Sequence, residues 1–299
     1  MKNSCKEINL IKNLELSKDV NSFLNSFPVD KSVLICGQVA TLEDWKKRRK
    51  LRKLPLIGIF ISMVEFVFYR FLPKISFVKL FYNITGFNSN KFLSKAEVLG
   101  RFIYNGFEII EFTQEDGYHR FKIRKNSPGL SNEVPTGFII SLDRLGLNGK
   151  KIKVFKIRTM HSYSEYIHKY MIVNYGFNSR GKIENDFRIT KWGRILRKFW
   201  IDEIPQIFNL LRGDLKIVGI RPVGEAYFNQ LPEKIKEKRL LFKPGCIPPY
   251  VSLNMQSNVE DVIRADEIYM NEYSKNKFVD FRYFFLAIYC IIVKRKRSS

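Results

Sequence analysis

The chain has 299 residues, with 52 Lys and Arg residues against 29 Asp and Glu residues, and a formal net charge of +23 at pH 7. This length suffices for one large domain or two small ones, and the charge excess indicates a negatively charged partner: nucleic acid, an anionic membrane surface or a phosphorylated substrate. The four cysteines have no metal-binding spacing, which argues against a zinc site.

The first part of the chain, residues 1–125, is expected to form a small α+β accessory region of unknown role. A short apolar run predicts a strand over Ser32–Cys36, and the pattern over Ser94–Asn105 is typical of a helix. Phe107–Thr113 and Tyr118–Arg124 are expected to pair as strands around an Asp-Gly turn.

Inside this region a basic cluster precedes a long apolar run. From Lys46 to Lys53, seven of eight residues are Lys or Arg, and Leu54–Val64 then carries no charge. Anionic lipid headgroups attract such cations, with about 1 kcal/mol per residue near the surface. Because the run falls short of the roughly 20 residues that span a bilayer, we interpret 54–82 as an interfacial or shallowly inserted helix. A buried core helix with solvated flanks is the alternative.

The next elements are two strands that form a hairpin. Gly137–Leu142 and Lys151–Arg158 flank an Asn-Gly sequence, which is a strong hairpin signal. Alternation along the second strand places Lys156 and Arg158 on one face. This pattern favours a cationic strand near a site, although solvated strand charges explain it equally well. From residue 190 onward helices are expected to dominate.

A one-sided apolar spacing on both sides of an Asp-Glu pair predicts two short amphipathic helices. Residues at i, i+3, i+4 and i+7 are apolar in both segments: Trp192, Ile195, Leu196 and Phe199, then Ile204, Ile207, Phe208 and Leu211. Asp202 and Glu203 lie at the junction, and Pro205 suits the first turn of the second helix. Free backbone N–H groups at such a helix start favour an ionised carboxylate and a bound phosphate alike.

Arginines are concentrated around this pair. Five lie within 34 residues of sequence: Arg188, Arg194, Arg197, Arg212 and Arg221. Arginine suits phosphate because its planar guanidinium donates two parallel hydrogen bonds. A carboxylate among so many cations is expected to be ionised near neutral pH and available as a nucleophile. A simple helix cap is the alternative interpretation of the pair.

The last apolar run, Tyr283–Val293, is uncharged, rich in aromatic residues and closed by the basic residues 294–297. Like 54–82, it is interpreted as lying at an anionic membrane surface.

Six short motifs follow one another in a fixed order. They are Lys156-Ile157-Arg158-Thr159-Met160, R-x-T-x-x-G-x-x-x-R from Arg188 to Arg197, D-E-x-P-Q from Asp202, N-x-L-x-G-D from Asn209, G-x-R-P from Gly219 to Pro222, and Lys243-Pro244-Gly245. Over roughly residues 120–299 the chain resembles the bacterial sugar transferases, the monotopic phosphoglycosyl transferases that load a sugar phosphate onto undecaprenyl phosphate. The resemblance implies a mainly helical catalytic domain of the α+β class over 126–299, with a small β-hairpin and membrane association.

The resemblance also implies a two-step reaction. Asp202 matches the family's nucleophile and would attack the β-phosphate of a UDP-sugar, expelling UMP and forming a covalent sugar-phosphate intermediate. Undecaprenyl phosphate would then take the sugar phosphate and so initiate a surface polysaccharide or glycan. Glu203 matches the second carboxylate of the dyad, and a bound Mg2+ is expected beside Asp202. The implied contacts to substrate or phosphate are Lys156, Arg158, Arg188, Arg197, Arg221, Pro222 and Lys243.

The chain departs from the family pattern in its attachment and its loops. The family's catalytic domain usually follows directly on a hydrophobic N-terminal helix that re-enters the membrane, whereas here more than a hundred residues come first. Ile220 stands where proline is usual, and Ile247-Pro248-Pro249-Tyr250 replaces a tryptophan-containing loop. The expected location is the cytoplasmic face of the bacterial inner membrane, peripheral or monotopic.

A binding protein is the alternative to an enzyme. The chain would then be an inactive basic protein that binds membrane or nucleic acid and keeps a relic transferase domain. We expect anionic membrane lipids rather than nucleic acid as partners, because the basic clusters flank long apolar runs and no aromatic-basic RNA-binding signature occurs.

Overall fold

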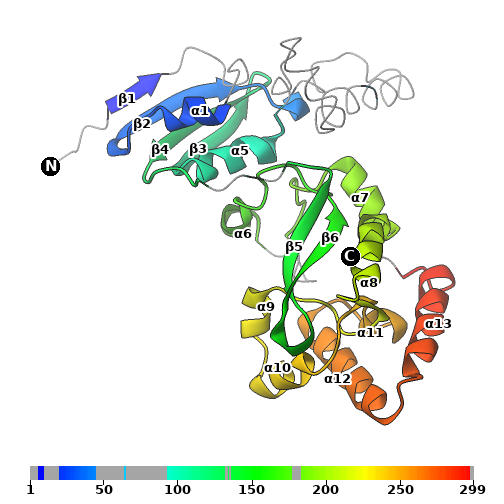
Figure 1. Cartoon of the computed structure of the whole chain (residues 1–299). Coiled ribbons are helices and arrows are strands. Elements are labelled where there is room, and N and C mark those ends of the chain that lie inside the picture. The colour runs from blue at the N-terminus through cyan, green and yellow to red at the C-terminus, as the bar shows by residue number, and fades with distance from the viewer. Residues whose placement is uncertain are drawn as a thin grey trace. The chain divides into compact units, whose positions relative to one another are not determined.

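The structure is a computed structural model that describes residues 6–9, 20–44, 64, 93–131, 134, 136–176 and 183–296. The chain forms two compact units, each assembled from segments distant in sequence (Figure 1). The first unit takes Met1–Phe138, Met160–Phe177 and Ile183–Arg188, and the second takes Ile139–Thr159, Asn178–Lys182 and Ile189–Ser299. Helices and strands occur in both units, as the α+β class requires. The predicted domain boundary between residues 125 and 126 stays a prediction.

The first unit contains a four-stranded sheet in the order β1-β2-β4-β3. Its strands are β1 (Lys6–Asn9), β2 (Asp30–Val39), β3 (Phe107–Glu115) and β4 (Tyr118–Lys125). β1 pairs with β2 in parallel, and the other neighbours are antiparallel. The expected strand at 32–36 and the expected β3–β4 hairpin are confirmed. Asp116 (φ 49°) and Gly117 (φ 75°) adopt the left-handed conformation that a two-residue hairpin turn needs.

Two helices, α1 (Val20–Asn25) and α5 (Lys95–Tyr104), supply the apolar side chains that pack on this sheet. The predicted helix at 94–105 is confirmed, and Ser94 caps it by accepting a hydrogen bond from the backbone N–H of Glu97 at 3.2 Å. Buried residues from both helices and three strands form one core: Val20, Leu24, Ile35, Val39, Val98, Phe102, Phe107, Phe121 and Ile123.

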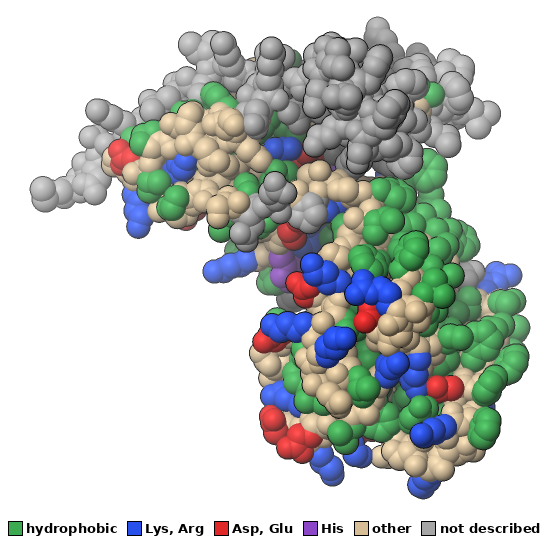
Figure 2. All heavy atoms as spheres, viewed as in Figure 1, with side chains coloured by type: hydrophobic (Ala, Val, Ile, Leu, Met, Phe, Trp, Pro, Cys, Tyr) green, Lys and Arg blue, Asp and Glu red, His purple; other side chains and the backbone are tan. Residues whose placement is uncertain are grey.

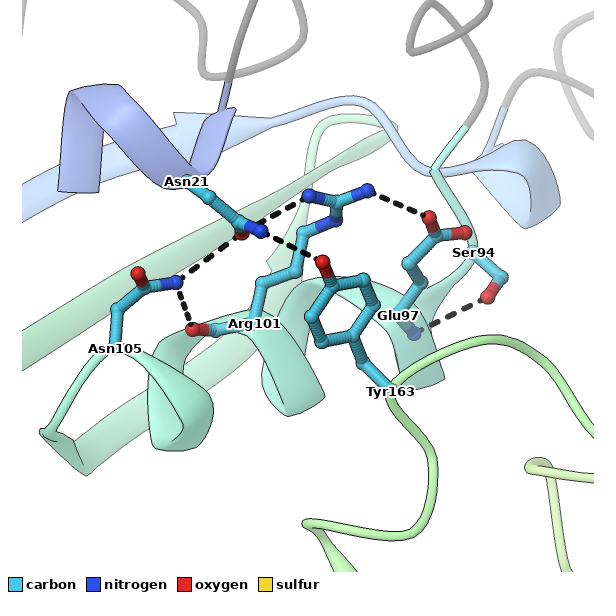
Figure 3. Close-up of polar contacts among 6 residues, drawn as sticks. All are labelled: Asn21, Ser94, Glu97, Arg101, Asn105 and Tyr163. Atoms are coloured by element: carbon cyan, nitrogen blue, oxygen red, sulfur yellow. Dashed lines mark hydrogen bonds and ion pairs between the residues drawn. The ribbon is translucent and has the colours of Figure 1, made fainter. Parts of the chain in front are cut away.

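The segment after Met160 packs on α5 of the same unit (Figure 3). Arg101 is buried, donates from Nη1 to Asn21 Oδ1 at 2.9 Å, and stacks 4.4 Å from the ring centroid of Tyr163. Asn21 in turn donates to the Tyr163 hydroxyl at 2.6 Å. Gly100 allows this close approach, because a Cβ there would lie 2.1 Å from the Tyr163 carbonyl oxygen. The helix α6 (His168–Tyr175) follows and buries Met171 against α5.

The second unit begins with an antiparallel hairpin of β5 (Ile139–Leu145) and β6 (Lys151–Ile157). It confirms the hairpin predicted from the Asn-Gly sequence, and its turn includes a short 3-10 helix, η6 (Leu147–Gly149). Asn148 (φ 54°) and Gly149 (φ 74°) take the left-handed conformation of the turn.

The rest of this unit is mainly helical, as expected. Its helices are α7 (Lys191–Lys198), the 3-10 helix η7 (Ile201–Gln206), α8 (Ile207–Leu211), α9 (Glu225–Asn229), α10 (Glu233–Leu240), α11 (Pro249–Ser252), α12 (Val259–Lys275) and α13 (Val279–Ile292). Two short parallel strands, β7 (Lys216–Val218) and β8 (Gly245–Ile247), pair between them. Val218 packs with the fully buried Tyr269 and Tyr283 of α12 and α13.

Several helices of the second unit expose apolar side chains. In Figure 2 hydrophobic side chains gather along the side of this unit where α7 and α13 lie. We call the exposed large apolar side chains of α7, η7, α8 and α13 and the residues that directly adjoin these helices the apolar surface: Trp192, Ile195, Phe199, Ile204, Ile207, Phe208, Leu211, Phe278, Phe281, Phe285, Leu286, Tyr289, Ile292 and Val293. Over the described ranges, no helix has both the length and the apolar character needed to cross a membrane. The expected interfacial helix at 54–82 falls, apart from Val64, outside the described residues.

Candidate active site

Asp202 and Glu203 lie in the first turn of η7, between α7 and α8. Trp200 precedes them in the left-handed conformation (φ 62°) and so redirects the chain after α7. The predicted junction between two short helices is confirmed, but α8 begins only at Ile207, so Ile204 lies in the 3-10 turn. Asp202 is 6% exposed, whereas Glu203 is half-buried.

The two carboxylates have different partners. Lys156 Nζ lies 2.7 Å from Glu203 Oε1, and Gln206 donates from Nε2 to Glu203 Oε2 at 3.1 Å. Both oxygens of Glu203 are therefore engaged. Asp202 Oδ1 is buried and has no hydrogen-bond partner within the described part of the chain. Asp202 is thus the carboxylate with an oxygen left over for another group.

Opposing effects set the protonation of Asp202. Burial raises the pKa of its carboxyl above the ordinary value; the positive charge of Lys156 opposes this rise, the charge of Glu203 adds to it, and Arg197 opposes it. The cations favour the ionised form that the sequence predicts, while burial removes water from it. A carboxylate held in this way has lost part of its solvation and is a stronger nucleophile for it.

The R-x-T-x-x-G-x-x-x-R motif has a clear structural basis from Thr190 onward. Thr190 caps α7 by accepting a hydrogen bond from the Gly193 N–H at 2.8 Å, and its own N–H donates to the Thr159 carbonyl at 2.9 Å. Gly193 must be glycine, because a Cβ there would lie 2.0 Å from that carbonyl oxygen. One turn later, Arg197 Nε donates to Thr159 Oγ1 at 2.9 Å. The motif thus fastens Arg197 to the end of β6 and within electrostatic reach of Asp202.

Asn209 joins α8, the helix that follows the dyad, to the hairpin. Its side chain is fully buried; Oδ1 accepts from the Phe155 N–H at 3.0 Å and Nδ2 donates to the Lys153 carbonyl at 2.7 Å. Its carbonyl accepts from the Asp214 N–H at 3.0 Å. Asn209 therefore sets the register between α8 and the strand that carries Lys156. The sequence marked Asn209 only as part of a motif, and no local rule assigns it this role.

The G-x-R-P and Lys243-Pro244-Gly245 motifs meet through their backbones. The Gly245 N–H donates to the Ile220 carbonyl at 3.0 Å, and a Cβ on Gly245 would lie 2.2 Å from the Gly219 nitrogen. Arg239 donates from Nη2 to the Arg221 carbonyl at 2.6 Å and forms a buried ion pair with Asp266. These contacts fix the loop while the Arg221 side chain stays exposed.

Tyr250 connects this loop electrostatically with the dyad. Burial raises the pKa of its hydroxyl; the positive charge of Arg221 opposes the rise and the negative charge of Glu203 adds to it. The buried Tyr250 therefore lies within reach of both charges. Sequence reasoning noted this residue only as a departure in a loop.

The other predicted site residues are placed as follows. Arg158 directly follows β6, while Pro222 and Lys243 are half-buried beside β7 and β8. Arg188 belongs to the first unit, where Asp186 holds its Nη2 at 2.7 Å and His168 Nδ1 lies 3.0 Å from its Nη1. The structure thus brings Lys156, Glu203, Asp202 and Arg197 together, while Arg188 forms an ion pair with Asp186. The predicted substrate or phosphate contacts of Arg158, Arg188, Pro222 and Lys243 stay predictions.

The site's fit to Mg2+ rests on Asp202. Among the described residues no group of three or more His, Cys, Asp or Glu side chains could hold a metal ion. Mg2+, however, is usually bound by one or two carboxylates together with substrate phosphates and water. The buried Oδ1 of Asp202 without a partner is a suitable ligand of this kind.

Comparison with known proteins decides the family. The model of the bacterial sugar transferase family matches residues 130–294, which include the dyad and its surrounding motifs. This chain belongs to the bacterial sugar transferase family. A galactosyl transferase, CpsE, of Streptococcus agalactiae is 36% identical over 140 residues, covering 46% of this chain and 31% of that protein.

Two further relatives show the same partial overlap. The sugar transferase EpsL of Bacillus subtilis is 33% identical over 155 residues, 51% of this chain and 66% of that protein. An undecaprenyl-phosphate galactose phosphotransferase of Salmonella typhimurium is 35% identical over 107 residues, 34% of this chain and 22% of that protein. The chain thus spans less than two thirds of the length of each of these relatives.

Proposed function

We propose that this sugar transferase moves a sugar 1-phosphate from a UDP-sugar to undecaprenyl phosphate, with Asp202 as the nucleophile. The observation that carries the proposal is the contrast within the dyad: Lys156 and Gln206 each engage one oxygen of Glu203, whereas Asp202 keeps a buried oxygen without a partner in the described structure. The relative named an undecaprenyl-phosphate galactose phosphotransferase supports the substrate classes.

The reaction has two displacements at one phosphorus atom. First, a carboxylate oxygen of Asp202 bonds to the β-phosphorus of the UDP-sugar, the bond from that phosphorus to the bridging oxygen breaks, and UMP leaves with the electron pair. Second, an oxygen of undecaprenyl phosphate bonds to the same phosphorus and displaces the aspartate. The product is undecaprenyl diphosphate sugar, and Asp202 returns to its starting state.

The surrounding cations perform most of the catalytic work in this proposal. Phosphoryl transfer depends mainly on positioning and on stabilising charge on the phosphate oxygens. Arg197 is fixed by Thr159, and Lys156 is fixed by Glu203. Both charges act on Asp202 and therefore on a phosphate bound against it. When bound by Asp202 and phosphate oxygens, Mg2+ supplies further neutralisation of the diphosphate charge.

The apolar surface supports a place at the membrane for this chemistry. A water-soluble domain rarely exposes so many large apolar side chains on adjacent helices. Three of the helices involved, α7, η7 and α8, also carry or flank the dyad. We therefore place the apolar surface in the membrane interface, on the side from which a lipid phosphate would reach Asp202.

Release of UMP in the absence of lipid tests the proposal. Purified protein in detergent is mixed with each of a panel of UDP-sugars, and UMP is measured before lipid is added. A covalent route gives a burst of one UMP per active site, which EDTA suppresses, followed by turnover when undecaprenyl phosphate is supplied. If the first UMP forms only after lipid is added, direct transfer replaces the aspartyl intermediate. If no UDP-sugar yields UMP under either condition, the protein is a binding protein with a relic domain.

A further inference from the structure

The end of strand β5 lies against the loop that follows Arg221. The Leu145 N–H donates to the Val223 carbonyl at 3.0 Å, and Leu145, Gly146 and Arg221 line the same small pocket. The residue before Leu145 is Arg144, which none of the motifs described above includes. β5 therefore brings a second arginine to the G-x-R-P loop from a distant part of the sequence.

Two backbone segments lie against the Arg144 guanidinium. Its Nη1 donates to the Asp143 carbonyl at 2.8 Å. Gly224 is also close, since a Cβ there would be 3.3 Å from the same Nη1. The guanidinium is half-buried and is positioned by backbone rather than by an acidic side chain. A long cationic side chain fixed in this way loses little further freedom when it binds a ligand.

Arg144 and Arg221 lie close enough to repel each other. Burial lowers the pKa of the Arg144 guanidinium, the positive charge of Arg221 lowers it further, and Asp143 opposes the change. Within the described residues neither arginine forms an ion pair with a carboxylate, and the nearby Asp266 is taken by Arg239. Folding thus brings two like charges close together although neither has an ion-pair partner among the described residues, an arrangement that a bound anion would stabilise.

We propose that Arg144 joins Arg221 in holding one phosphate group of a substrate. Two planar guanidinium groups offer the parallel N–H donors that phosphate oxygens accept. Tyr250, which lies within electrostatic reach of both Arg221 and Glu203, connects this pair of arginines to the dyad. This inference rests on the proposed function. The ligand is a phosphate monoester or a diphosphate, belonging either to the nucleotide or to the lipid acceptor.

Direct binding to the full-length protein in detergent tests this inference. UMP and farnesyl phosphate, a short and soluble prenyl phosphate, are titrated separately by calorimetry into wild type, Arg144→Gln, Arg144→Lys and Arg221→Gln. Lys151→Gln is the matched control, because it removes one positive charge from the strand residue paired with Leu145 while that charge is already compensated by Glu225 at 3.1 Å. Thermal unfolding of each variant verifies that the fold is retained.

We expect Arg144→Gln and Arg221→Gln each to weaken the binding of one of the two phosphates by about 10- to 100-fold. Arg144→Lys should retain only part of the affinity, because lysine keeps the positive charge but lacks the planar guanidinium that donates two parallel hydrogen bonds. Weaker binding of UMP assigns the site to the sugar donor, and weaker binding of farnesyl phosphate assigns it to the lipid acceptor. If Arg144→Gln binds both phosphates as the Lys151→Gln control does, the inference is overturned. Should Arg144→Gln not fold, an unchanged affinity in Arg144→Lys overturns it instead.

These binding measurements separate the inference from the proposed function. A wild-type protein that binds UMP through Arg144 but forms no UMP from any UDP-sugar keeps the phosphate site and loses the transferase. A protein that shows the UMP burst with unchanged phosphate affinity in Arg144→Gln keeps the transferase and loses this site.

Discussion

Lys156 Nζ and Glu203 Oε1 lie 2.7 Å apart, so that the strand β6 and the turn η7 are joined by an ion pair beside Asp202. Both side chains are about one-fifth exposed, at 20% and 18%. The pair neutralises one carboxylate of the dyad and leaves the positive charge close enough to act on the other. The two adjacent carboxylates therefore differ: Glu203 orients the Lys156 ammonium group, and Asp202 keeps a buried oxygen without a partner in the described structure.

The first prediction follows from that free oxygen. Asp202→Asn replaces the nucleophile by a neutral amide of nearly the same volume. The burst of UMP and the lipid-linked product should fall on the order of 1000-fold or more, because no covalent intermediate forms. The melting temperature should not fall, since the lost oxygen has no partner in the described structure. Wild-type levels of product from this variant would sink the mechanism.

Glu203→Gln should be less severe. The amide keeps the contact with Gln206 but loses the charge that holds Lys156. We expect a decrease of about 10- to 100-fold in kcat, in line with the loss of one charge-assisted hydrogen bond. Lys156→Met in the same background should add little, because the two residues act as a pair. Fully additive effects of the two substitutions on kcat would show that Lys156 acts independently of Glu203.

Local rules in the sequence predict part of the fold and part of the site. The turn sequences Asp116-Gly117 and Asn148-Gly149, whose residues are left-handed in the structure, predict both hairpins. The apolar spacing predicts that the dyad lies between two helices. The i, i+3, i+4 spacing usually marks a helix face that packs on a core. In α7 and α8 that face is exposed instead, so the pattern identifies an apolar helix face but does not tell whether the fold buries it.

Long-range contacts are what the sequence did not reveal. Lys156 meets Glu203 across 47 residues, and Asn209 meets Phe155 across 54. Arg188 shows the same limit through its contact with α6, since its Nη1 lies 3.0 Å from His168 Nδ1, 20 residues away in sequence. Spacing within a motif fixes a helix cap or a turn, whereas these contacts depend on how separate elements pack.

Asn209 provides a prediction for stability. Asn209→Ala removes the partners of the Phe155 N–H and the Lys153 carbonyl. We expect a decrease of about 2–4 kcal/mol in the free energy of unfolding of the second unit, because buried backbone groups lose their hydrogen bonds. Asn174→Ala is the control: its side chain also donates to a backbone carbonyl, at 2.8 Å, but is exposed. Equal melting temperatures for the two variants would contradict the role assigned to Asn209.

His119 makes the first unit sensitive to acid. Its side chain is buried, stacks on Phe112 and contacts Asp44 Oδ2 through Nδ1 at 2.7 Å. Burial lowers the pKa of His119 below 6.5; Asp44 opposes this shift, Lys95 adds to it and Glu43 opposes it. The unfolded chain therefore binds a proton near pH 6.5 that the folded chain resists, so stability should fall as the pH drops below about 6.5.

Melting temperatures between pH 7.5 and about 4.5 test this dependence. Asp44 interferes little in that window, because hydrogen bonds from Thr41 and His119 outweigh burial and hold its pKa below 3.8. His119→Gln should be less stable at neutral pH but show a flatter decline on acidification. A decline as steep as that of wild type would assign the acid sensitivity to other groups.

The last prediction concerns the apolar surface. Phe281, Phe285 and Ile292 lie on one side of α13 and are 66%, 64% and 69% exposed. Replacing all three by serine should weaken co-sedimentation with vesicles that contain anionic lipid by at least about tenfold, since each side chain contributes up to about 1.5–3 kcal/mol when fully buried. The melting temperature in detergent should stay unchanged, because these side chains pack little against the fold. High salt should weaken wild-type binding without abolishing it, as ions screen charge but not apolar burial.

The matched control replaces Val173, Leu241 and Val259, which are also exposed but lie outside the apolar surface. If both triple variants bind vesicles as the wild type does, α13 does not enter the membrane, and lipid must reach Asp202 from another side.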